Sequence, residues 1–119
     1  MDNYKNFNHI KIHTQYSICE GALRINDLAE FCKKNKIKCV GLSDTTNLCG
    51  ALEFSENLSK IGTQPIIGTQ VNFKFADQIG LLPLIATSEE SYKSIIEMSS
   101  NSYLKNDGMS KPHCNFKDL

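Results

Sequence analysis

Four strand-like segments alternate with three helix-like segments along this chain, and that alternation constrains the fold more than any other feature. In the third strand-like segment, Val71 and Phe73 alternate with Asn72 and Lys74, as expected for a strand with two different faces. Strands that alternate with helices predict an α/β fold with a largely parallel sheet or barrel, whose chemistry gathers at the carboxyl ends of the strands. The strand-like segments are residues 8–13, 39–44, 64–75 and 81–87.

The helix-like segments are bounded by recognisable signals. Asn26 is a suitable N-cap for the first helix, and Gly62 fits the position just past the end of the second. Thr87 and Glu90 have the spacing of a capping box for the third. No strand is expected after that helix, because the chain becomes polar. We therefore assign residues 1–106 to the folded unit and residues 107–119 to a polar segment that leads out of it.

Composition excludes several classes of function. Basic and acidic residues both number 13, so no excess of charge points to nucleic acid or a membrane surface. No apolar run approaches the roughly 20 residues of a membrane-spanning helix, and the first residues lack the order of a signal peptide. The five cysteines are odd in number and contain no C-x-x-C pair, which favours reduced thiols over disulfides or a zinc ribbon. We expect a cytoplasmic protein without a membrane partner.

Polar residues collect where the predicted strands end, while the common nucleotide-binding, hydrolase and metalloprotease motifs are missing. An imidazole and carboxylates that converge at these ends could hold a metal ion. They could equally form a polar mouth in which side chains hydrogen-bond one another, and spacing alone leaves both interpretations open. The residues concerned are His9, Lys11, His13, Glu20, Asp44, Thr45 and Gln70.

Three blocks of the sequence resemble successive blocks of the PHP (polymerase and histidinol phosphatase) domain family. They are "HIKIHTQYSICEGALRINDL", "GLSDTTNLCGALEF" and "QPIIGTQVNF", and they occur in the family's order and spacing over about residues 7–75. The version they resemble opens the alpha subunit of bacterial DNA polymerase III. The resemblance implies the first βα units of a distorted, parallel, TIM-like PHP barrel, which is incomplete in a chain of this length.

The resemblance also indicates which residues stand at the family's metal-ligand positions. Lys11 places a cation where a ligand should be, Thr45 replaces an imidazole, and Gln70 replaces a carboxylate. We therefore expect a vestigial site with no functional metal cluster and no catalytic residue. The family's ligand positions fall on Lys11, His13, Glu20, Asp44, Thr45 and Gln70.

Two arrangements of Lys11 are possible, and our hypothesis is the first. Its ammonium group could take the place of the metal and form a substitute polar network with Glu20 and Asp44. Alternatively, the side chain could extend from the strand into solvent.

The resemblance implies a non-catalytic module of a replicative DNA polymerase alpha subunit, which supports the polymerase and docks the proofreading exonuclease and other replicase subunits. The parent protein would be a DNA-directed DNA polymerase, a nucleotidyltransferase that extends DNA from dNTPs with magnesium. The fragment itself would need no cofactor. The alternative is a metal-dependent phosphoesterase or 3'-5' exonuclease of the PHP family. A third possibility, a free-standing small βα protein, is disfavoured by the unclosed barrel.

Overall fold

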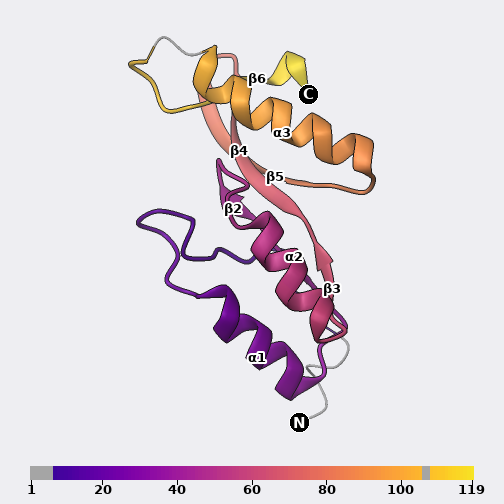
Figure 1. Ribbon diagram of the computed structural model, residues 1–119. Helices are drawn as coiled ribbons and strands as arrows, with labels where there is room; N and C mark the ends of the chain where they lie inside the picture. The colour runs from indigo at the N-terminus through magenta and orange to yellow at the C-terminus, as the bar shows by residue number, and fades with distance from the viewer. Residues whose placement is uncertain (1–6, 106–107) are drawn as a thin grey trace.

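The computed structural model describes residues 7–105 and 108–119 of the chain (Figure 1). The boundary expected at residues 106 and 107 lies outside the described residues. The elements in order are α1 (Ile25–Asn35), β1 (Cys39–Gly41), β2 (Asp44–Thr45), α2 (Ala51–Lys60), β3 (Gln64–Ile66), β4 (Gly68–Phe75), β5 (Gln78–Ile85), α3 (Glu89–Leu104), β6 (Cys114–Asn115) and a 3-10 turn, Phe116–Asp118.

The strands form an α/β structure in which most pairings are parallel. Strand β1 pairs with β3, while β2 and β6 both pair with β4, in each case in parallel. The exception is β5, which forms an antiparallel hairpin with β4. The strand predicted at residues 81–87 lies earlier in the chain than expected, because β5 spans Gln78–Ile85. Ala76 takes a left-handed φ of 53° in the remaining two-residue turn, and such a short connection can join only antiparallel neighbours.

Several predicted strands are shorter or more interrupted than their sequence patterns indicate. Residues 8–13 form no regular strand and contribute a single parallel bridge, between Ile12 and Leu42. Segment 39–44 is divided into β1 and β2, and segment 64–75 into β3 and β4. The prediction that no strand follows α3 is wrong, because β6 pairs with β4 at Phe73 and Lys74. A two-residue strand carries too little periodicity to be recognised in a polar stretch.

The ends of the helices agree only in part with the predicted signals. Helix α1 begins at Ile25, so Asn26 lies inside it and does not cap it. Gly62 does lie just past the end of α2, with a left-handed φ of 80°. Glycine adopts that conformation without the steric cost that a side chain would add.

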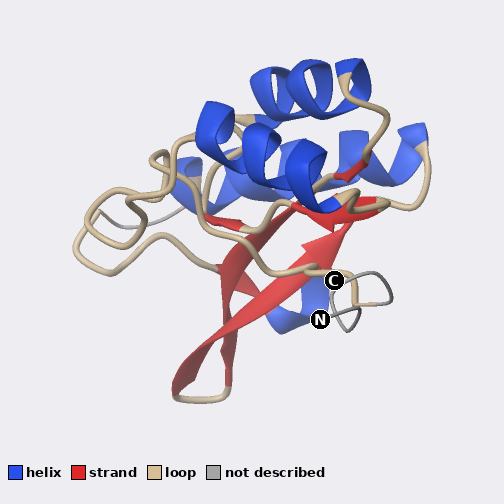
Figure 2. Ribbon diagram, turned by 90° about the horizontal axis from the view of Figure 1, so that it is seen from below, coloured by secondary structure: helices blue, strands red, loops and turns tan. Residues whose placement is uncertain are grey.

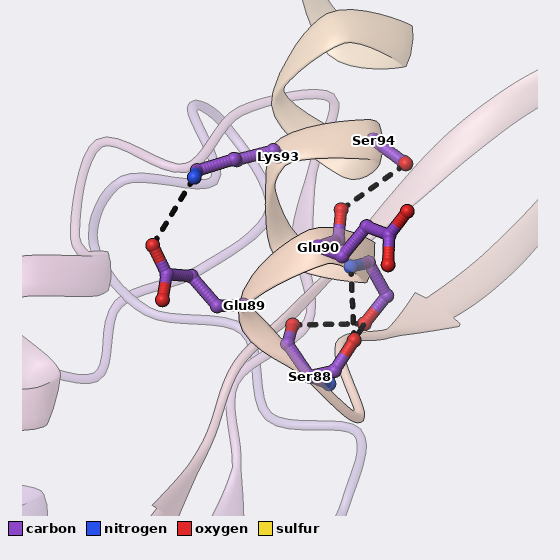
Figure 3. A network of polar contacts seen from close by, with 6 residues as sticks. Ser88, Glu89, Glu90, Lys93 and Ser94 are labelled. Atoms are coloured by element: carbon purple, nitrogen blue, oxygen red, sulfur yellow. Dashed lines mark hydrogen bonds and ion pairs between the residues drawn. The ribbon is translucent and has the colours of Figure 1, made fainter.

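Helix α3 is capped by Ser88 and Ser91 instead of the predicted Thr87 and Glu90 (Figure 3). The backbone N–H of Ser91 donates to Ser88 Oγ at 3.1 Å, and the backbone N–H of Ser88 donates to Ser91 Oγ at 2.8 Å. The box is thus displaced by one residue, with a serine in the role that glutamate usually has.

The buried apolar side chains form two clusters. The larger one lies between α1, α2 and β1, with Phe54 and Leu58 fully buried. The smaller one joins Val71 and Phe73 of β4 to Cys114, with Met98 of α3 packed against it. The hairpin connects the two regions in Figure 1, and its turn end projects beyond the helices in Figure 2. The chain is accordingly elongated, measuring 47 × 30 × 24 Å.

Candidate functional site

The predicted site residues come from three segments that meet beside β2. Asp44 and Thr45 form β2 itself, and Thr45 stands opposite Gln70 of β4. Gln70 therefore lies inside β4 and not at its end as predicted, because β4 continues to Phe75. His13 lies in the N-terminal segment that leads into the loop before α1. The structure thus brings His13, Asp44, Thr45 and Gln70 into one region.

Asp44 is the centre of this region and is fully buried. Its carboxylate accepts hydrogen bonds from the backbone N–H of Thr14 at 2.6 Å, from Thr14 Oγ1 at 2.7 Å and from Ser17 Oγ at 2.8 Å. A buried carboxylate is costly unless donors of this kind satisfy it, and charge-assisted bonds are the stronger class. Asp44 therefore fastens the loop that follows His13 to strand β2.

Ser17 links Asp44 to the imidazole of His13. His13 Nδ1 lies 3.3 Å from Ser17 Oγ, and His13 Nε2 lies 3.2 Å from Gln70 Nε2. Ser17 Oγ also accepts the backbone N–H of Thr45 at 3.1 Å. Both ring nitrogens of His13 are therefore engaged by protein groups, with the ring half-buried between them.

Glu20 and Lys11 lie at the exposed rim of the site. Thr45 Oγ1 donates to Glu20 Oε2 at 2.6 Å, so this carboxylate has a hydroxyl partner. Lys11 is exposed, and within the described residues it forms no ion pair with Glu20 or Asp44. The expected network of Lys11, Glu20 and Asp44 is therefore wrong. The carboxylate of Asp44 accepts hydrogen bonds from hydroxyl and backbone N–H groups of the neighbouring loop, and the side chain of Lys11 is exposed to solvent.

A second set of contacts holds the same loop against the start of α2. The hydroxyl of Tyr16 donates to Glu53 Oε2 at 2.6 Å, and this hydrogen bond raises the pKa of Tyr16 above its ordinary value. Asn47 Nδ2 donates to the Tyr16 carbonyl at 2.8 Å, and Asn47 Oδ1 accepts the backbone N–H of Cys49 at 3.1 Å. The ring of Tyr16 lies so close to Gly50 that a Cβ there would be 2.7 Å from it. These contacts explain Asn47 and Gly50 as residues that shape the entry to α2.

Reasoning from the sequence missed Thr14 and Ser17, whose donors complete the site. Both follow His13 closely, but isolated hydroxyl residues in a loop are common and have no diagnostic spacing. The sequence indicates them only indirectly. A buried aspartate at the end of a strand needs hydrogen-bond donors, and the hydroxyls of Thr14 and Ser17 lie on the segment next to it.

Three of the six residues at the family's expected ligand positions, Lys11, Thr45 and Gln70, carry neither an imidazole nor a carboxylate. The carboxylate of Asp44 accepts three hydrogen bonds from Thr14 and Ser17, and both ring nitrogens of His13 contact protein side chains. Throughout residues 7–105 and 108–119, no three His, Cys, Asp or Glu side chains lie together as a metal site would require. All five cysteines are free thiols, and burial raises the pKa of Cys32.

Comparison with known proteins identifies the family. The family model described as PHP domain matches residues 9–119. The chain belongs to the PHP domain family. The DNA polymerase III alpha subunit of Rickettsia felis is 38% identical over 114 residues, which are 95% of this chain and 9% of that protein. That of Haemophilus influenzae is 31% identical over 106 residues, or 87% of this chain and 9% of that protein.

The PHP chain therefore spans about one tenth of the length of these curated relatives. Among solved structures, it is similar to a Bifidobacterium adolescentis protein described as a candidate metal-dependent phosphoesterase. The TM-score is 0.64 at 23% identity, covering 80% of this chain and 32% of that one. This similarity supports the assignment of the fold to part of a PHP barrel. Among the described residues, no helix is long and apolar enough to cross a membrane.

Proposed function

We propose that this chain is the PHP region of a replicative DNA polymerase alpha subunit and that it acts there as a structural, metal-free module. The observation that carries the proposal is the buried carboxylate of Asp44, whose oxygens are occupied by Thr14 and Ser17. In this proposal the site fastens a loop to the sheet instead of activating water for hydrolysis.

The parent protein would be a DNA-directed DNA polymerase, because its relatives are named DNA polymerase III subunit alpha. In this proposal it is cytoplasmic and extends DNA from dNTPs with magnesium. The PHP region would support that polymerase and bind the proofreading exonuclease and other replicase subunits. Co-purification of the tagged chain with the exonuclease subunit of the same genome tests the docking role. Stable co-elution in gel filtration is the expected result, and separate elution at micromolar concentrations would argue against it.

A metal-dependent phosphoesterase or 3'-5' exonuclease is the second candidate. The solved structure described as a candidate phosphoesterase favours it, as do His13 and Glu20, which keep ligand-type side chains. The deciding experiment measures bound metal by mass spectrometry and phosphodiester hydrolysis with added Mn²⁺ or Zn²⁺. We expect no stoichiometric metal and no hydrolysis that depends on His13. Activity that His13→Ala abolishes would overturn the metal-free proposal.

A further inference from the structure

The direction of each hydrogen bond around His13 can be worked out from Asp44. An ionised carboxylate only accepts, so the Ser17 hydroxyl, 2.8 Å from Asp44 Oδ1, must donate its proton there. A hydroxyl has one proton and two lone pairs. Ser17 Oγ must therefore accept from its other two neighbours, which are the backbone N–H of Thr45 at 3.1 Å and His13 Nδ1 at 3.3 Å.

The imidazole of His13 is consequently held in one tautomer. Nδ1 carries the proton that Ser17 accepts, and Nε2 presents a lone pair because the NH₂ group of Gln70 that faces it can only donate. The side-chain amide of Gln70, 3.2 Å away, donates to that lone pair. The donors then run in a single direction, from Gln70 to His13, from His13 to Ser17, and from Ser17 to Asp44.

We propose that Gln70 is a positioning residue that closes this site to metal ions, an inference that rests on the metal-free function proposed above. Metals bind histidine through a ring-nitrogen lone pair, and the lone pair on His13 Nε2 is already used by the amide. A glutamate at position 70 could only accept. The lone pair of His13 Nε2 would then have no donor from position 70 and would lie beside a carboxylate, open to a metal ion. The change from carboxylate to amide thus does more than remove a charge, because it adds a donor that occupies the neighbouring ligand.

The tautomer can be observed directly in the full chain. Long-range ¹H–¹⁵N spectra of the labelled protein at neutral pH should show His13 as the neutral Nδ1–H form, with exposed His9 as the internal reference. Adding Zn²⁺ should leave the His13 signals in place. In Gln70→Glu the donor to His13 Nε2 is absent, and Zn²⁺ should bind about tenfold more tightly through His13.

Asn72→Asp is the matched control, because it adds the same charge two residues along β4. Asn72 donates to the Pro112 carbonyl at 3.2 Å and has no hydrogen bond with His13. This variant should leave the tautomer of His13 and its response to Zn²⁺ unchanged. If it instead reproduces the effect of Gln70→Glu, the added charge alone is responsible and the donor role of Gln70 is refuted.

Two results separate this inference from the proposed function. An Nε2–H tautomer of His13 in an inactive, metal-free natural chain would overturn the hydrogen-bond chain alone. Metal-dependent hydrolysis by a natural chain that keeps the Nδ1–H signature would overturn the metal-free function and leave the hydrogen-bond chain intact.

Discussion

Replacing Asp44 with asparagine should destabilise the folded chain by roughly 3 kcal/mol, because it removes the charge on which three hydrogen bonds depend. The amide oxygen can still accept from the Thr14 backbone and from Ser17. Hydrogen bonds to a charged acceptor contribute about 1.5–3 kcal/mol each, against about 0.5–1.5 kcal/mol for neutral ones, so these two weaken by about 1 kcal/mol each. At the third contact an NH₂ group faces the Thr14 hydroxyl, which loses its acceptor.

Urea unfolding of the full chain, followed by far-ultraviolet circular dichroism, measures this loss. With a slope of about 2 kcal/mol per molar urea, the midpoint should fall by about 1.5 M. Glu20→Gln is the control, because its hydrogen bond to Thr45 lies at the exposed rim. It should change the free energy of unfolding by less than about 0.5 kcal/mol. A loss below about 0.5 kcal/mol for Asp44→Asn, or an equal loss for both variants, would refute the view that the buried charge holds the loop.

Three further outcomes follow from the geometry. The hydrogen bond from Tyr16 to Glu53 raises the pKa of Tyr16, so the stabilisation that this bond gives should be complete below the ordinary tyrosine pKa of about 10 and be lost as pH rises through the higher folded-state pKa. Glu53→Gln should lower the Tyr16 pKa measured by tyrosinate absorbance, and an unchanged titration would contradict this. Gly68→Ala should lower the free energy of unfolding in urea by about 1–3 kcal/mol, because the added Cβ would lie 2.4 Å from a backbone oxygen of β5. Gly80→Ala is the control, because a Cβ there meets nothing within 4 Å and should leave the stability nearly unchanged. Equal losses for the two variants would exclude the steric explanation. Ser88→Ala should cost about 1 kcal/mol and increase amide exchange in the first turn of α3, and unchanged exchange would show that the cap contributes little.

The sequence pattern was sufficient to predict the α/β class and to bring most of the candidate site together. Alternating segments located β1 with β2, β3 with β4, and the three helices to within a few residues. The resemblance then placed Asp44, Thr45 and Gln70 correctly on adjacent strands. These features are repeated along a segment or fixed by its register, so local residues carry the information.

The remaining features depend on long-range contacts that no local pattern records. Lys11 was expected inside the site because its charge seemed to compensate for a lost metal. A carboxylate can be satisfied by hydroxyl and backbone donors as well as by a cation, and the donors that reach Asp44 come from Thr14 and Ser17. Likewise, β6 is a strand because Cys114 and Asn115 pair with β4, from which β5 and α3 separate them in the sequence.

The hairpin described above also determines how one side of the sheet meets solvent. Within the described residues β5 pairs only with β4, and its side chains at Ile79 and Leu81 are almost half exposed. An uncovered edge of this kind is a template on which another strand can add, and so a route to aggregation. Gln70 stands opposite Pro83, but its backbone carbonyl accepts from Thr46 on the other side of β4. The backbones of Gln70 and Pro83 are therefore not hydrogen-bonded to each other, and that of Pro83 faces the open edge. There the proline ring removes one N–H donor, so a strand added along β5 would meet a gap in its ladder of hydrogen bonds.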